Sequence, residues 1–120
     1  MKTVIDLASE SPVLPEFPDC GICILESHHK QGFVMPISKY EFSEVMLILD
    51  GRGFVTSGKT RHPVRKQNII TVPKDTPYFY EDDPGAPLAM LCLCLRPPVG
   101  YQAVFDLVMP TRFQVIRNLS

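Results

Sequence analysis

Prolines and glycines interrupt this sequence at short intervals: 12 of its 120 residues are Pro and seven are Gly. So many turn-forming residues favour short elements joined by turns, which suits a β architecture better than a bundle of helices. Turn signals such as Asp50-Gly51 and Asp82-Asp83-Pro84-Gly85 separate the apolar segments. Their spacing predicts an all-β sandwich or small barrel. Seven or eight short strands are expected, within the segments 20–26, 32–37, 44–49, 52–57, 68–72, 76–81, 88–95 and 113–116.

The chain is expected to form a single domain around one core, because 120 residues suffice for one. Residues 1–19 are predicted to be an irregular N-terminal arm that drapes over the core, since Pro12, Pro15 and Pro18 are too closely spaced for a helix. The barrel then covers about residues 20–97. Residues 98–120 are expected to supply a short helix at 101–108 and a terminal strand.

The charge balance argues against a domain that binds nucleic acid by itself. Twelve Lys and Arg oppose 13 Asp and Glu, so the formal net charge is −1 and no basic excess is available to neutralise phosphates. The longest uncharged apolar run, 88–95, is too short to span a bilayer. Asp6 stands where a signal peptide needs apolar residues, so a cytoplasmic protein with reduced thiols is expected.

Two predicted strands are apolar on both faces. In 44–49 and in 88–95, both alternating sets of positions carry almost only apolar residues. A strand of this kind must also be covered on the side that faces away from the core. The cover could be a terminal segment, a second subunit or a further domain.

Four motifs follow one another between residues 39 and 95: Tyr40-Glu-Phe-Ser-Glu44 before an apolar strand, the turn Gly51-Arg-Gly53, Pro73-Lys-Asp-Thr-Pro-Tyr78, and the acidic turn Glu81-Asp-Asp-Pro-Gly85. In this order they resemble the cupin half of AraC-type transcription regulators. The resemblance implies a small cupin barrel (a double-stranded β-helix, jelly-roll-like) that senses a small molecule and forms a homodimer. It also implies a helix-turn-helix domain that reads DNA. This chain shows no such segment, so we expect it to be an excised or truncated N-terminal domain.

The sequence departs from the resemblance at the metal-ligand positions. Metal-binding cupins use His at three of these positions and a carboxylate at the fourth, whereas the equivalent residues here are Ser38, Tyr40, Glu44 and Tyr78. Neutral imidazole is a good ligand for divalent transition metals, but a phenol titrates near about 10 and a serine hydroxyl far higher. We therefore expect neither a metal nor another cofactor.

The same side chains predict a ligand cavity. If the cupin register holds, residues that alternate along each strand point into the barrel interior. Hydroxyl groups, aromatic walls and one carboxylate could hold a small organic ligand such as a sugar or a small acid. The alternative is a barrel filled by its own aromatic side chains, with the carboxylate paired to an Arg. The predicted ligand-binding residues are Ser38, Tyr40, Glu44, Tyr78 and Tyr80.

Two classes of function remain, a sensor domain and a stand-alone cupin enzyme (an isomerase, lyase or oxygenase) with a degenerate metal site. In the enzyme, Glu44 would act as the base and Tyr78 or Tyr40 as the acid. The missing metal ligands favour the sensor, for which no catalytic residue is predicted.

The predicted helix at 101–108 presents Val104, Phe105 and Val108 at helical spacing. In the resemblance, the helix after the barrel mediates dimers, so these three residues are the predicted dimerisation contacts. The alternative is a helix that caps the end of the barrel.

The four cysteines are interpreted as buried structural residues, since Cys behaves as a small hydrophobe. Residues three apart on a strand face opposite sides, so Cys20 and Cys23 would not converge on one zinc ion. Cys92 and Cys94 share a face but lie in an apolar run.

The three histidines are interpreted as surface residues. His28 and His29 are adjacent, so on a strand they point to opposite faces and cannot bind one ion together. His62 lies in a predicted hairpin between Arg61 and Pro63. The local sequence supports no Ser-His-Asp or Cys-His pairing and no glycine-rich phosphate loop.

Overall fold

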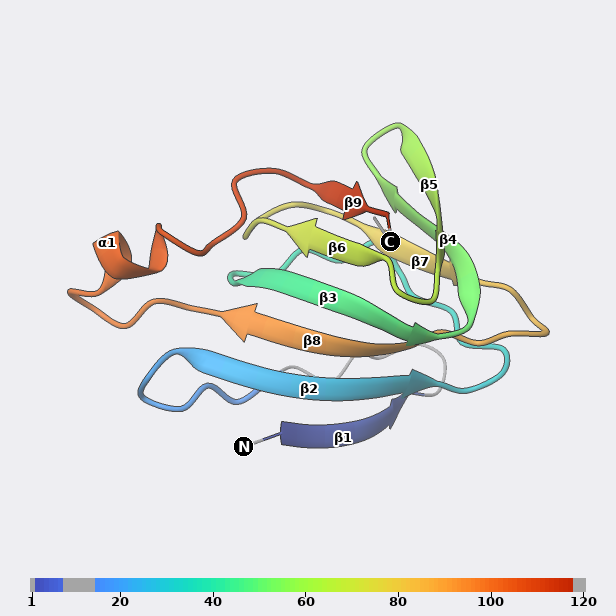
Figure 1. Cartoon of the computed structure of the whole chain (residues 1–120), viewed down its shortest axis with the longest axis horizontal. Helices are drawn as coiled ribbons and strands as arrows, with labels where there is room; N and C mark the ends of the chain where they lie inside the picture. Colours follow the sequence, from blue (N-terminus) through green and yellow to red (C-terminus); the bar gives the residue numbers. More distant parts are fainter. Residues whose placement is uncertain (1, 8–14, 118–120) are drawn as a thin grey trace.

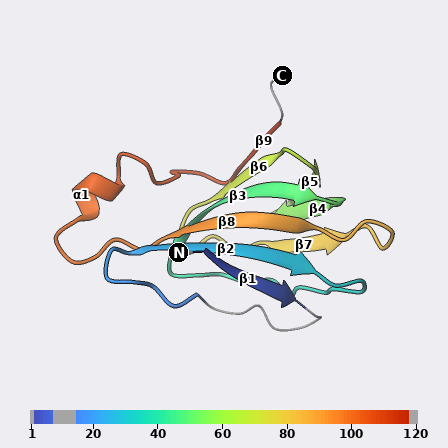
Figure 2. The ribbon, with the colours of Figure 1, turned by 60° about the horizontal axis from the view of Figure 1, so that its bottom comes forward.

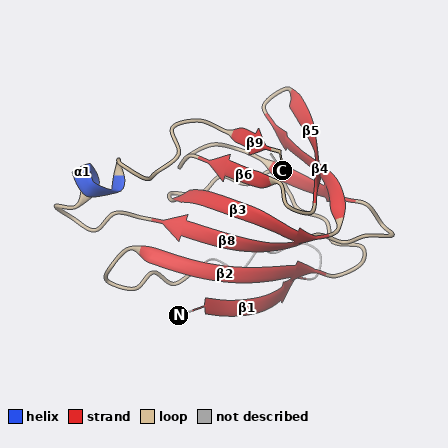
Figure 3. Ribbon diagram, in the orientation of Figure 1, coloured by secondary structure: helices blue, strands red, loops and turns tan. Residues whose placement is uncertain are grey.

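The computed structural model describes residues 2–7 and 15–117, and it consists mainly of strands (Figures 1 and 3). This confirms the predicted all-β class. The described strands are β1 (Lys2–Leu7), β2 (Ile22–His29), β3 (Ser43–Asp50), β4 (Arg52–Ser57), β5 (Thr60–Arg65), β6 (Ile69–Val72), β7 (Phe79–Asp82), β8 (Ala89–Leu95) and β9 (Gln114–Ile116). The one helix among these residues, α1 (Gln102–Phe105), is far too short to cross a membrane.

The strands form two sheets. One has six strands in the order β1-β2-β8-β3-β6-β9, and the other has three in the order β5-β4-β7. All pairings are antiparallel except that of β1 with β2. The two sheets do not join edge to edge into one closed, hydrogen-bonded cylinder. Figure 2 shows the larger sheet as a curved layer, with α1 at the opposite end from the β4–β5 hairpin.

Alternation along the strands decides which side chains enter the core. In β3, Glu44, Met46 and Ile48 are buried, while the intervening residues are only half-buried. The inward positions of β8 are Met90, Cys92 and Cys94, all at most 6% exposed. These residues meet Val55, Val64 and other side chains of the smaller sheet in one apolar cluster, so the core lies between the two sheets.

The outer face of the six-stranded sheet is also apolar. Half-buried residues from four neighbouring strands line a shallow depression on it: Ile24, Val45, Leu47, Ile69, Leu91 and Leu93. Four of them, Val45, Leu47, Leu91 and Leu93, are outward positions of β3 and β8, the two strands that the sequence indicated to be apolar on both faces.

The Gly51-Arg-Gly53 turn owes its glycines to a close approach of two chain segments. Gly51 has a φ of +84°, and a Cβ added there would lie 2.1 Å from the carbonyl oxygen of Pro87. A Cβ at Gly53 would lie 2.3 Å from the carbonyl oxygen of Glu81. Arg52 donates its N–H to the Ala86 carbonyl and accepts one from the N–H of Asp83. The turn therefore holds the acidic segment that follows β7 in place.

Two predictions about the ends of the chain were wrong in part. Residues Lys2–Leu7 of the expected irregular arm form β1, which pairs in parallel with β2. The prediction rested on three prolines, and the first of these lies outside the described residues. It overlooked the β-branched residues Thr3, Val4 and Ile5, which favour an extended edge strand.

The helix expected over 101–108 is also shorter than predicted. It ends at Phe105, and residues 106–108 form turns in which Leu107 donates to the Val104 carbonyl and Val108 to that of Phe105. So short an amphipathic segment gains little from helix propagation.

Candidate ligand-binding site

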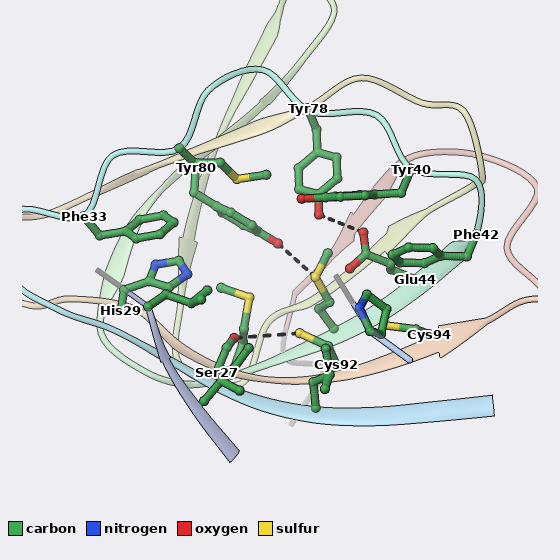
Figure 4. Close-up of a pocket in the computed structure, with 17 residues that line it drawn as sticks. Ser27, His29, Phe33, Tyr40, Phe42, Glu44, Tyr78, Tyr80, Cys92 and Cys94 are labelled. Atoms are coloured by element: carbon green, nitrogen blue, oxygen red, sulfur yellow. Dashed lines mark hydrogen bonds between the residues drawn. The ribbon is translucent and has the colours of Figure 1, made fainter. Parts of the chain in front are cut away.

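A cavity of about 60 Å³ lies between the sheets (Figure 4). It is lined by side chains from β1, β2, β3, β7 and β8 and from the extended segment between β2 and β3. That segment runs beside β7 through two isolated bridges, Val34 with Glu81 and Ser38 with Tyr78. Pro15, ahead of β2, and Tyr78, just before β7, also line the cavity, so its walls come from both sheets and from several non-strand segments.

The carboxyl group of Glu44 enters the cavity from β3, and Tyr78 lies opposite, just before β7. The Tyr78 hydroxyl donates to Glu44 Oε1 over 2.7 Å, and the two residues are 3% and 6% exposed, respectively. Burial raises the pKa of Glu44 to about 7, because the hydrogen bond from Tyr78 offsets only part of the lost hydration. Burial, together with the Glu44 charge, also raises the pKa of Tyr78, so the phenol keeps its proton. The pair is thus a neutral or singly charged hydrogen-bonded unit around neutral pH.

Aromatic rings form a continuous wall along one side of the cavity. Tyr80 continues this wall from Tyr78, and its hydroxyl contacts the sulfur of Met46 over 3.1 Å. The wall provides flat apolar contact area for a bound molecule. Successive ring centroids lie 3.8 Å apart for Phe33 and His29, 5.9 Å for His29 and Tyr80, 5.5 Å for Tyr80 and Tyr78, 6.2 Å for Tyr78 and Tyr40, and 5.0 Å for Tyr40 and Phe42.

Sulfur atoms dominate the opposite side. Met46, Met90, Cys92 and Cys94 line the cavity there, and the Ser27 hydroxyl lies 4.0 Å from the Cys92 sulfur. Burial, reinforced by the Glu44 charge, raises the pKa values of the Cys92 and Cys94 thiols far above the usual range of a cysteine. These thiols stay protonated, so they act as polarizable apolar surface rather than as nucleophiles.

His29 is the cavity residue that sequence reasoning missed. Its ring is stacked on Phe33, and its side chain is 2% exposed. Nδ1 lies 2.9 Å and 3.1 Å from the two carboxylate oxygens of Asp82, at the end of β7. Asp82 also accepts a hydrogen bond of 3.0 Å from the Leu88 N–H. The prediction that this histidine lies on the surface was therefore wrong.

The alternation of side chains along their strands could have indicated that both His29 and Asp82 face the interior. His28 and His29 do face opposite sides, as expected, and His28 is the exposed one, paired with Glu26. Asp82 has the same parity as Tyr78 and Tyr80, which the sequence already directed inward. Their contact could not have been foreseen, because β2 and β7 belong to different sheets.

Four of the five predicted ligand-binding residues, Tyr40, Glu44, Tyr78 and Tyr80, line the cavity together. Ser38 does not. Its hydroxyl donates to the Pro36 carbonyl over 2.9 Å, so the alternation expected over 38–44 holds only from Tyr40 onward, through Phe42 to Glu44. The alternative in which Glu44 pairs with an Arg is also wrong, since its partner in the described chain is Tyr78.

The predicted dimerisation residues divide into two kinds. Val104 and Val108 are 60% and 69% exposed, whereas Phe105 is 9% exposed and turned toward the protein.

Among the cysteines, Cys20 is exposed, contrary to expectation, because it lies in the turn before β2 rather than on the strand.

The cavity side chains do not suit a divalent metal. They offer one carboxyl group of raised pKa, phenols and thiols that keep their protons, and a single imidazole, that of His29. In the described part of the chain, no three His, Cys, Asp or Glu residues are grouped to hold an ion.

Two facing sheets around a small, mostly apolar cavity define a ligand-binding domain of the cupin class. Structural comparison supports this fold. A cupin protein from Bacteroides fragilis superposes with a TM-score of 0.57 at 16% identity, over 77% of this chain and 86% of that one. An RmlC-like cupin from Desulfovibrio desulfuricans gives 0.53 at 18% identity, over 65% and 74%.

Sequence comparison identifies the family. The model of the AraC-like ligand binding domain matches residues 20–100, and the chain belongs to this family. The resemblance and the cupin fold expected from the sequence are thereby confirmed. An uncharacterized protein from Methanocaldococcus jannaschii is 35% identical over 63 residues, which are 52% of this chain and 50% of that protein. The chain thus matches about half the length of this curated relative.

Proposed function

We propose that this chain is the sensor domain of an AraC-type transcription regulator, which binds a small organic molecule in the cavity between its sheets. DNA would be read by a helix-turn-helix domain outside this chain, and the regulator would act in the cytoplasm. The observation that carries the proposal is the buried Glu44–Tyr78 pair, held at 2.7 Å inside an otherwise apolar cavity. Buried polar groups beside an apolar wall are what a site needs to orient a small ligand.

The chemistry of the lining favours binding over catalysis. The Tyr78 and Tyr80 hydroxyls are already engaged with Glu44 and Met46, and the Cys92 and Cys94 thiols keep their protons. A nucleophile is normally activated by a lowered pKa, whereas burial raises the pKa of each of these phenols and thiols.

We further propose that the regulator is a homodimer and that Val104 and Val108 contact the second copy. Both side chains are more than half exposed, at the end of the domain where α1 projects (Figure 1). Sedimentation would test this: the Val104→Asp dimer should already dissociate at a protein concentration at which the unsubstituted protein is still dimeric. A monomer at every concentration of the unsubstituted protein would contradict it.

The experiment that tests the cavity is a thermal-shift screen of sugars and small organic acids, with hits measured by titration calorimetry. We expect at least one compound to bind, and Glu44→Gln and Tyr78→Phe to weaken it several-fold. Tyr101→Phe is the matched control, because it removes a phenolic hydroxyl from a residue that is 58% exposed. If the affinity of the compound were unchanged in both cavity variants, the ligand would bind outside this cavity.

One observation favours a second candidate, an enzyme of the isomerase or lyase type. A carboxyl group with a pKa of about 7 suits proton transfer at neutral pH, and the cavity also holds the His29–Asp82 pair. Prolonged incubation of a bound compound with the protein, followed by NMR, separates the two candidates. Unaltered compound supports the sensor, and conversion that is lost in Glu44→Gln supports the enzyme.

A further inference from the structure

The second polar group of the cavity, His29 with Asp82, has a fixed orientation. Both Asp82 oxygens accept from His29 Nδ1, and one also accepts from the Leu88 N–H. A carboxylate accepts hydrogen bonds and cannot donate them, so the hydrogen of the neutral ring is on Nδ1. Stacking on Phe33 at 3.8 Å and 17° fixes the ring plane as well.

This arrangement leaves the other ring nitrogen, Nε2, for the cavity. His29 lines the cavity, and in residues 2–7 and 15–117 no group hydrogen bonds to its Nε2. In Figure 4 the imidazole lies at the end of the cavity next to Phe33 and Tyr80, while Glu44 lies beyond Tyr80, near Tyr40 and Phe42. The cavity therefore has two separate polar ends.

We propose that His29 and Asp82 form a carboxylate-binding subsite, and that the ligand is a small monocarboxylic acid with an apolar body. This inference rests on the proposed function and deepens it. The ligand carboxylate binds together with one proton, which Nε2 takes up from solvent, so that an imidazolium ion lies between the Asp82 carboxylate and the ligand carboxylate. Nε2–H then donates a charge-assisted hydrogen bond to the ligand, while Asp82 stabilises the positive ring.

The remaining lining suits such a body better than a sugar. Each hydroxyl of a bound sugar needs a partner in the protein, and an unpaired buried hydroxyl costs affinity. The hydroxyls of Tyr78 and Tyr80 already donate within the protein, to Glu44 and Met46, so they offer a ligand only their acceptor lone pairs. The cavity is also small, at about 60 Å³, which favours a compact ligand. A short alkyl chain between the aromatic wall and the sulfur side meets these conditions.

The test compares butanoic acid with butan-1-ol and glucose at one pH near 7, by calorimetry and NMR. We expect butanoate to bind at least tenfold more tightly than butanol, because the alcohol cannot form the ion pair. His29→Gln should remove this preference, and the butanol affinity should change little. His28→Gln is the matched control, since His28 is the neighbouring residue on the opposite face and its partner is Glu26.

A second readout does not depend on any variant folding. In the unsubstituted protein, butanoate should shift the ¹⁵N resonance of His29 Nε2 and leave that of His28 in place. If glucose or butanol binds, depends on Glu44 and Tyr78, and leaves the His29 resonance unmoved, the carboxylate subsite is refuted and the proposed sensor function stands. If neither these probes nor the wider screen moves any cavity resonance, both proposals fail.

Discussion

Replacing Glu44 by Gln should remove the part of the pH dependence of folding stability that this carboxyl group causes. The carboxyl group has a pKa of 4.5 in its ordinary environment and about 7 in the folded protein, because burial disfavours its charged form. Between these values the folded protein holds a proton that the unfolded chain has lost, so the free energy of unfolding falls as pH rises through this window. An interval of about 2.5 pH units at about 1.4 kcal/mol each gives about 3.5 kcal/mol.

Gln is neutral at every pH and can still accept the hydrogen bond from Tyr78. The stability of this variant relative to the unsubstituted protein should therefore be nearly constant below pH 4.5 and should improve by about 3.5 kcal/mol by pH 8. Urea unfolding at a series of pH values measures this difference as a change in midpoint on the order of 1–3 M. If the difference in free energy of unfolding between Glu44→Gln and the unsubstituted protein were the same below pH 4.5 and at pH 8, the reasoning would be refuted.

Two further variants provide controls for this experiment. Tyr78→Phe removes the hydrogen bond that lowers the pKa of Glu44, so the loss of stability should extend to higher pH. Glu26→Gln should instead lower stability relative to the unsubstituted protein at neutral pH, and this difference should shrink as pH falls. The pKa of this carboxylate is lowered, first by its hydrogen bond from Lys2 and then by that with His28, so its contribution is present above the unfolded pKa and disappears as pH falls.

Two other expectations concern the backbone and the thiols. Gly53→Ala should destabilise the fold by about 1–3 kcal/mol in urea unfolding, because the new methyl group meets the Glu81 carbonyl at 2.3 Å. Gly85→Ala, whose nearest contact would be 3.5 Å, should be tolerated, and equal costs for the two variants would contradict this account. A thiol reagent should label one cysteine rapidly in the native state, and Cys20→Ser should abolish that phase, since the other three thiols are buried. Rapid labelling of a second thiol would show that the core opens more readily than the packing indicates.

Parity along individual strands made much of the site predictable. The alternation of Tyr78 and Tyr80, and the position of Glu44 ahead of an apolar strand, directed three side chains into the interior, where the structure has them. The same rule held for Tyr40 and Phe42 but failed for Ser38, because it assumes continuous extended backbone and no named strand includes residue 38. It could not suggest the pairing of His29 either, since parity assigns a side chain to a face and does not name the strand it meets.

The sequence by itself determined the kind of architecture and the chemistry on offer: frequent turns, strands with alternating burial, and one carboxyl group among phenols and thiols. These properties follow from local backbone preferences and from the identity of each side chain. Only the tertiary structure decided which groups share the cavity and in what protonation state. Two sheets close over Glu44 and remove its water, and β7 brings Asp82 to His29 from 53 residues away. Both desolvation and long-range contact are set by packing between elements, which no short stretch of sequence encodes.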